Sequence, residues 1–183
     1  MNRFFKKICS FFRLERHPRK QFKRIGHSVE LPVNGIIADK SNIEIESHVY
    51  IGPEPYIFGK GGLSIGRNVI IGPRVTIHTT NHNFDSNDCL PYDQVSYIRP
   101  VTIGKNVWIA SNVLICPGVT LEEGCVVGMG AVVTKSFQKG SIIGGNPAEI
   151  IRMRDLETYD VLEREGKHYL VLKEAGKIRN TYV

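Results

Sequence analysis

The residues best suited to chemistry lie in one polar stretch, IHTTNHNFDSND at residues 77–88. Its second histidine, His82, stands between Asn81 and Asn83, with Asp85 a little further along the chain. A neutral imidazole, whose ordinary pKa is about 6.5, takes a proton from a hydroxyl at neutral pH when its other nitrogen is held by a hydrogen bond. We therefore predict that His82 is a general base.

The polar neighbours of His82 have both a functional and a structural interpretation. We expect His78, Asn81 and Asp85 to line the same site and to contact the molecule that loses the proton. Asp85 could instead orient His82, or it could be an ordinary turn residue, as Asp often is. The site therefore depends on what holds this stretch in place.

The stretch precedes a six-residue repeat that starts at Val101 and reads VTIGKN, VWIASN, VLICPG, VTLEEG, CVVGMG, AVVTKS. The third residue of every block is aliphatic: Ile103, Ile109, Ile115, Leu121, Val127 and Val133. The first is small or β-branched: Val101, Val107, Val113, Val119, Cys125 and Ala131. This spacing fits neither an amphipathic helix nor a hairpin strand.

The repeat predicts a coil with flat faces. Each block supplies a short strand with two inward apolar side chains and then a bend, so that three blocks close a triangle. Stacked triangles pair as parallel strands and share one dry core. A truncation such as Ile109→Ala or Ile115→Ala should then cost about 2–5 kcal/mol.

The same register continues upstream. It begins at Ile43 after a transition over residues 25–42, slips by two residues at Gly59–Gly62, breaks after His78 and returns at Val101. Residues 78–100 are therefore predicted to be a loop that leaves the coil, and loops on rigid scaffolds often carry function. We expect one coil domain over residues 25–154 and a segment over residues 155–183 that caps the last open coil.

Residues 1–24 form a separate basic arm. They hold nine Lys or Arg and one acid, a net charge of +8, so the remaining chain sums to −2 and does not suggest a nucleic-acid surface. Five apolar residues at helical spacing, Phe4, Phe5, Ile8, Phe11 and Phe12, predict an amphipathic helix. Through residues 1–20 it could lie on an anionic membrane surface, or it could pack on the body or another subunit.

Composition bounds the remaining possibilities. The sequence has neither a secretory signal nor an uninterrupted apolar stretch that spans a membrane. The four cysteines, Cys9, Cys89, Cys116 and Cys125, show no disulfide or metal spacing. We therefore expect a cytoplasmic protein, which could be peripheral on the inner face of the membrane.

Five motifs occur in a telling order: TNH at 80–82, PVTIGKNVWIAS at 100–111, VVTK at 132–135, GGNPA at 144–148 and IIR at 150–152. Over residues 43–154 the chain resembles the galactoside, maltose and capsular-sugar O-acetyltransferases of the hexapeptide-repeat family. The resemblance implies an all-β fold, the left-handed parallel β-helix. It also implies acetyl-CoA as the donor, no metal, and a homotrimer with active sites in grooves between subunits.

The motif match also assigns residues. His82 falls on the catalytic histidine, and Trp108 falls on the tryptophan that borders the groove near CoA. The CoA-contacting positions of the family fall on Ser111, Met129, Thr134, Lys135 and Arg152. Without the resemblance, Trp108 could be a subunit contact, and Lys135 and Arg152 could be ordinary solvated charges.

Three residues depart from the family pattern. Ala110 stands where glycine is common, and Met129 stands where alanine is frequent beside the pantetheine path. Glu149 replaces a residue that can be basic, which weakens the phosphate clamp there. These departures affect the CoA contacts and leave the predicted fold unchanged.

We predict an O-acetyltransferase that acts on a hydroxyl of a sugar or glycan precursor in polysaccharide biosynthesis. No Ser or Cys nucleophile with an adjacent base is visible, which favours direct transfer. One alternative is N-acetylation of a nucleotide-linked amino sugar. Others are a zinc hydratase, in which His78 and His82 join a third histidine of a neighbouring subunit, and a non-enzymatic trimeric scaffold.

Overall fold

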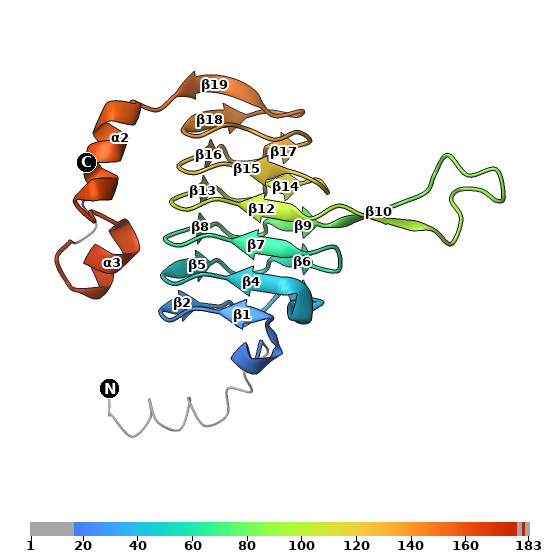
Figure 1. The fold of residues 1–183 in the computed structure, drawn as a ribbon, viewed down its shortest axis with the longest axis horizontal. Coiled ribbons are helices and arrows are strands. Elements are labelled where there is room, and N and C mark those ends of the chain that lie inside the picture. The colour runs from blue at the N-terminus through green and yellow to red at the C-terminus, as the bar shows by residue number, and fades with distance from the viewer. Residues whose placement is uncertain (1–16, 179–180, 182–183) are drawn as a thin grey trace.

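The computed structural model describes residues 17–178 and residue 181. It consists of stacked triangular coils, with a hairpin projecting on one side and two helices lying along another (Figure 1). The amphipathic helix predicted around Phe4–Phe12 lies outside the described residues. A short 3-10 turn, η1 (Arg19–Gln21), precedes the first coil.

Each complete coil contributes one strand to each of three sheets, whose strands are parallel except for β19. Sheet A contains β1 (Arg24–Ile25), β4 (Ile43–Ile45), β7 (Leu63–Ile65), β12 (Val101–Ile103) and β15 (Thr120–Leu121). Sheet B contains β2 (Val29–Glu30), β5 (Val49–Ile51), β8 (Ile70–Ile71), β13 (Trp108–Ile109), β16 (Val126–Val127), β18 (Ser141–Gly144) and β19 (Glu149–Met153). Sheet C contains β3 (Ile36–Ala38), β6 (Tyr56–Phe58), β9 (Thr76–His78), β14 (Leu114–Ile115) and β17 (Val132–Val133). The chain thus follows the predicted triangle.

The inward residues of the six blocks form the core, as the repeat predicts. All twelve first-position and third-position side chains are at most 2% exposed. Among them is Cys125, and burial raises the pKa of its thiol to about 11. A thiol held neutral in this way packs as a small apolar residue, as we expected.

The coil starts earlier than the sequence register indicated. Strands β1, β2 and β3 form a complete coil over residues 24–38, where the sequence predicts only a transition over residues 25–42. In this part each residue pairs with the one 20 positions later, for example Arg24 with Glu44 and Ile36 with Tyr56. Strands β12, β13 and β14 pair with β15, β16 and β17 at 18 positions, as Trp108 does with Val126. The first two coils are thus two residues longer than three six-residue blocks, and the 3-10 turn η2 (Lys40–Asn42) lies in the connection from β3 to β4.

The end of sheet B is covered by a strand that precedes the predicted capping segment. This strand, β19, pairs antiparallel with β18. The two helices that follow, α2 (Leu156–Arg164) and α3 (Tyr169–Glu174), turn back along the side of the stack (Figure 1). Strand β19 thus covers the end of sheet B from within residues 25–154, and the helices of residues 155–183 fasten the coils laterally.

The helices run along the turns that join sheet A to sheet B, here called the A–B corner. At this corner Ser28, His48, Asn68 and Asn106 all have a positive φ between 50° and 58°. Their side chains meet the helices in reverse order: Asn106 contacts α2, Asn68 accepts from the Leu170 N–H, and Ser28 and His48 meet Glu174. One segment thereby ties together successive coils that otherwise contact only their neighbours.

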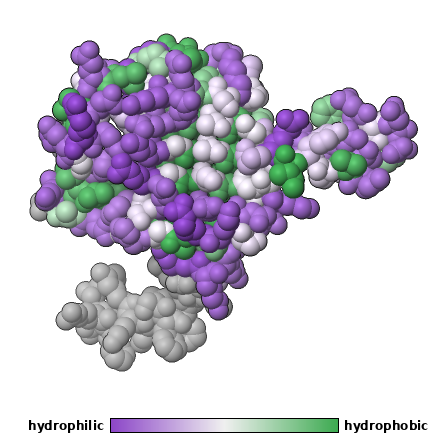
Figure 2. Space-filling view, viewed as in Figure 1, coloured by the Kyte–Doolittle hydropathy of each residue, from purple (hydrophilic) through white to green (hydrophobic). Residues whose placement is uncertain are grey.

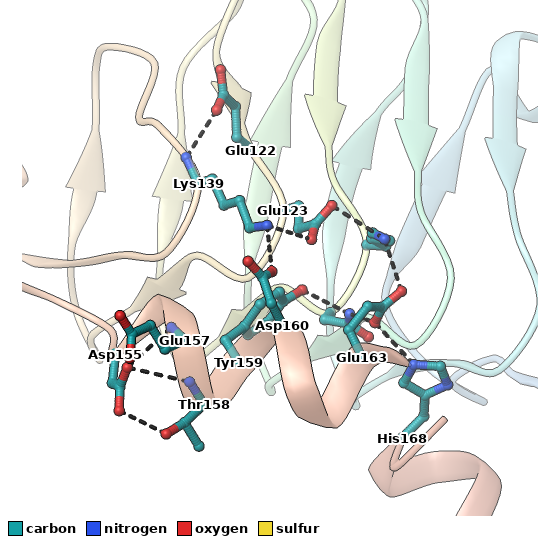
Figure 3. A network of polar contacts seen from close by, with 12 residues as sticks. Glu122, Glu123, Lys139, Asp155, Glu157, Thr158, Tyr159, Asp160, Glu163 and His168 are labelled. Carbon is teal, nitrogen blue, oxygen red and sulfur yellow. Dashed lines mark hydrogen bonds and ion pairs between the residues drawn. The ribbon is translucent and has the colours of Figure 1, made fainter. Parts of the chain in front are cut away.

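Glu163 is the centre of this attachment (Figure 3). Its carboxylate accepts from Lys105 Nζ at 2.8 Å and Asn106 Nδ2 at 2.6 Å, lies 2.9 Å from His168 Nε2, and also pairs with Arg67. Burial alone would raise the pKa of Glu163, but these partners together lower it to about 2. The carboxylate is therefore ionised at any pH near neutrality.

No helix in the part of the chain that the structure describes has the length and apolar character needed to cross a membrane.

Candidate functional site

The predicted loop is a projecting hairpin with a firm base. Its stem pairs β10 (Thr80–His82) with β11 (Ser96–Ile98) in antiparallel register. At the base, the buried Thr79 hydroxyl donates to the Phe58 carbonyl at 2.8 Å and accepts from the Gly61 N–H at 2.7 Å. A Cβ at Gly61 would lie 1.9 Å from the backbone carbonyl oxygen of Thr79, so only glycine fits there. The hairpin thus leaves the coil in a fixed direction.

His82 stands at the outer end of the stem, opposite Ser96. Its side chain is exposed, and its ring stacks on Tyr92 with centroids 4.0 Å apart and planes 14° apart. Its backbone N–H donates to Asn81 Oδ1 at 3.0 Å. The ring edge remains open to a reactant, while one ring face is covered.

The tip of the hairpin contains a buried carboxylate that the sequence analysis missed. Asp93 is 6% exposed, and its oxygens accept from Asn83 Nδ2 and from the Val95 N–H, both at 2.7 Å. Asn83 in turn accepts from the Tyr97 hydroxyl at 3.1 Å. Hydrogen bonds, first from Ser86 and then from Val95, lower the pKa of Asp93 although burial opposes them. Asn and Asp are so common in loops that their presence alone gave no signal.

The other residues predicted on the acceptor side lie apart from one another. His78, at the end of β9, stacks on Phe58 of the adjacent coil at 4.8 Å. Asn81 is on the stem beside His82. Asp85 is exposed on the tip and, within the described residues, has no side-chain hydrogen bond or ion pair, so it does not orient His82 here.

Trp108 lies on the outer face of sheet B. It is 51% exposed and stands in register between Ile70 and Val126. Together with Tyr159 and Leu162 of α2, it lines a groove of about 310 Å³ between sheet B and the C-terminal helices. A large aromatic face is therefore available on this side of the coil.

His82 and Trp108 lie on opposite sides of the triangular coil. The hairpin leaves between β9 of sheet C and β12 of sheet A, at the C–A corner, and sheet B is the side opposite that corner. Figure 1 shows the hairpin and the helix-covered side pointing away from each other. His82 and Trp108 of one chain therefore do not meet.

The predicted CoA-contacting residues occupy three parts of the exterior. Ser111 and the 72% exposed Met129 lie in stacked turns between sheets B and C, where the Gly130 N–H donates to the Ser111 carbonyl at 3.0 Å. Thr134 and Lys135 follow β17 at the C–A corner. Arg152 is exposed on β19. One chain alone thus does not gather them into a single site.

Lys135 is already paired. Its Nζ lies 2.8 and 2.7 Å from the two oxygens of Glu149. Both side chains are more than half exposed, so the pair contributes little stability. The Glu149 carboxylate nevertheless pairs with the ammonium group that the motif match assigns to CoA contact.

No group of three or more His, Cys, Asp or Glu side chains in the described part of the chain is placed to hold a metal ion.

Comparisons with known proteins identify similar sequences over the repeat and over most of the chain. The family model "Bacterial transferase hexapeptide (six repeats)" matches residues 100–135. The galactoside O-acetyltransferase of Escherichia coli K12 is 35% identical over 153 residues, which are 82% of this chain and 70% of that protein.

Solved structures agree with this relationship. A galactoside acetyltransferase in complex with coenzyme A superposes with a TM-score of 0.68 at 28% identity, covering 85% of this chain and 82% of the other. A hexapeptide-repeat acetyltransferase from Vibrio cholerae, complexed with acetyl-CoA, gives 0.66 at 27% identity, covering 74% and 73%. The chain therefore belongs to the hexapeptide-repeat acetyltransferases and is an acetyl-CoA-dependent enzyme of the galactoside O-acetyltransferase type.

Proposed function

We propose that this enzyme transfers the acetyl group of acetyl-CoA to a hydroxyl of a sugar or glycan precursor, with His82 as the general base. The observation that carries the proposal is the exposed edge of the His82 imidazole on a firmly based hairpin. The printed name of the Escherichia coli relative supports a sugar hydroxyl as the acceptor.

The proposed reaction is a direct transfer. A ring nitrogen of His82 removes the hydroxyl proton while the oxygen forms a bond to the thioester carbonyl carbon. The tetrahedral intermediate then collapses, the carbon–sulfur bond breaks, and the imidazolium returns its proton to the departing CoA thiolate. The protein supplies position and a proton carrier, and no enzyme-bound acetyl group forms.

The active site is proposed to lie between copies of the chain in a homotrimer. His82 and Trp108 face opposite directions, so a hairpin can approach the Trp108 side only of a neighbour. The hairpin also exposes apolar side chains, including Phe84 at 63%, Leu90 at 89% and Ile98 at 65%. Figure 2 shows hydrophobic residues on this projection. Such a surface favours coverage by a partner.

The coil surface supports the same assembly. Sheet A presents polar outward residues, such as Glu44, Ser64 and Thr102. Sheet C presents Tyr56 and Leu114, which are 48% and 45% exposed. A sheet with exposed apolar residues next to a sheet with polar ones fits a cyclic trimer in which each chain turns the same sheet towards the trimer axis.

The variant His82→Gln tests the proposal. The purified protein is assayed for loss of the acetyl-CoA thioester with p-nitrophenyl β-galactoside, maltose and UDP-linked amino sugars as separate acceptors. We expect transfer to a hydroxyl acceptor to fall roughly 10²–10⁴-fold with the melting temperature unchanged. The control is His27→Gln, which changes an exposed histidine in the first coil.

Two outcomes contradict the proposal. Full hydroxyl transfer by His82→Gln would remove His82 from the role of base. Transfer only to the amino sugars, with no dependence on His82, would favour N-acetylation, because an amine attacks without a strong base.

A further inference from the structure

The environment of His82 is built by residues from the other end of the hairpin tip. Tyr92 covers one face of the imidazole, at 4.0 Å between ring centroids and 14° between planes. Tyr92 lies ten positions after His82, and the segment between them is exposed for most of its length. Something must therefore hold Tyr92 against the ring.

The adjacent residue, Asp93, performs this function. It is the buried polar residue of the hairpin tip: it joins the two ends of the tip by accepting from Asn83 Nδ2, and it also accepts from the Val95 N–H two residues later. The backbone does the same, because the Asp93 N–H donates to the Asn83 carbonyl at 3.4 Å and the Asn83 N–H donates to the Val95 carbonyl at 3.1 Å. Asn83 directly follows His82, so the lock places Tyr92 beside the imidazole.

Stacking of this kind affects a general base in two ways. It restricts rotation of the imidazole about its terminal torsion, which is otherwise broad, so that a nitrogen points in one direction. It also places an aromatic face within 6 Å of the positive charge that the ring acquires when it takes a proton, and such contacts are favourable. Restricted rotation and stabilisation of the charged ring both favour proton transfer more than they favour substrate binding.

We propose that Tyr92 and Asp93 are positioning residues of the reaction: Asp93 locks the hairpin tip, and Tyr92 holds and covers the His82 ring. This inference rests on the proposed role of His82 as the base. It adds an aromatic and a carboxylate that act through His82 and need not touch substrate.

The first test does not depend on activity. Ring protons of His82, assigned by comparison with His82→Gln, should show the chemical-shift displacement that a stacked aromatic ring causes. Tyr92→Leu should abolish this displacement and Tyr92→Phe should keep it. Asp93→Asn should reduce it, whereas Asp88→Asn, which removes another carboxylate of the same tip, should not. Unchanged His82 shifts in Tyr92→Leu would overturn the inference.

The second test uses kinetics with acetyl-CoA and the hydroxyl acceptor that gives the highest rate. Tyr92→Leu should lower kcat roughly 10- to 100-fold with little change in the KM for acetyl-CoA, and Tyr92→Phe should restore most of the rate. Normal kcat in Tyr92→Leu, when His82→Gln is inactive, would refute the positioning role and leave the base in place. Normal transfer in His82→Gln would instead refute the proposed function itself.

Discussion

Glu163 of α2 and Asn106 at the A–B corner are joined by a hydrogen bond of 2.6 Å from the amide Nδ2 to the carboxylate. Asn106 has a positive φ of 58° and sits in the same place as Asn68 in the coil below, to which it is also bonded at 2.7 Å. The C-terminal helices therefore contact a column of equivalent turns in successive coils. Because Trp108 follows two residues later, the attachment also fixes the wall of the groove beside it.

Glu163→Gln should destabilise the protein in a pH-dependent manner. The folded pKa of about 2 is below the ordinary 4.5, so the ionised carboxylate contributes its full stabilisation above about pH 4.5. This contribution, up to about 3 kcal/mol, is lost as the pH falls from 4.5 towards 2. Melting temperatures of both proteins should differ most near neutral pH and converge at low pH.

The control for this measurement is Glu165→Gln on the same segment. Glu165 pairs with Lys167 at 2.7 Å, and both side chains are about half exposed. This change should have almost no effect at any pH. A difference between wild type and Glu163→Gln that stays constant with pH would contradict the assigned pKa.

Ile109→Ala should cost about 2–5 kcal/mol, because Ile109 is completely buried in the shared core and its truncation leaves a cavity. The matched control is Thr102→Ala, on the outward face of β12 in the same coil, which should change stability by less than about 0.5 kcal/mol. Denaturant unfolding measures both. Equal costs would mean that the alternation of inward and outward residues does not determine stability.

Glu149→Gln should tighten the binding of CoA by roughly 3- to 10-fold. The change frees the Lys135 ammonium from a carboxylate 2.7 Å away and removes one negative charge from its surroundings. Calorimetric titration with CoA measures the affinity, and Glu157→Gln on exposed α2 serves as the charge-matched control. Unchanged or weaker binding would place Lys135 outside the CoA site.

Two inactive variants should restore each other if the site lies between subunits. Coexpressed His82→Gln and Trp108→Ala chains would form mixed trimers in which about one quarter of the interfaces combine an intact His82 with an intact Trp108. Transfer activity should recover to about that fraction. If His82 and Trp108 instead served one site within a single chain, every chain in the mixture would lack one of the two residues. The mixture would then stay inactive.

The sequence predicted the coil well because its signal is local. Each block places two apolar side chains inward, and residues such as Ile103 and Val127 are buried as the period requires. The first coil was missed because Lys23 stands at the position equivalent to Ile43, so its first apolar pair is incomplete, although Val29 pairs with Val49 as the repeat requires. The break after His78 predicted a loop, which the structure shows to be a hairpin, and the motif order indicated His82.

The amino-acid sequence by itself determined the architecture, the position of the loop and the acetyltransferase family, because a repeating pattern and ordered motifs can be recognised without spatial contacts. Only the tertiary structure decided that Asp93 bonds Asn83, that Tyr92 covers His82, that Glu149 occupies Lys135 and that α2 is fastened by Glu163. Each of these depends on which side chains meet after the chain has closed its triangles. The residue types in a turn do not determine which side chain each of them contacts. That contact depends on burial and charge in the folded stack of coils.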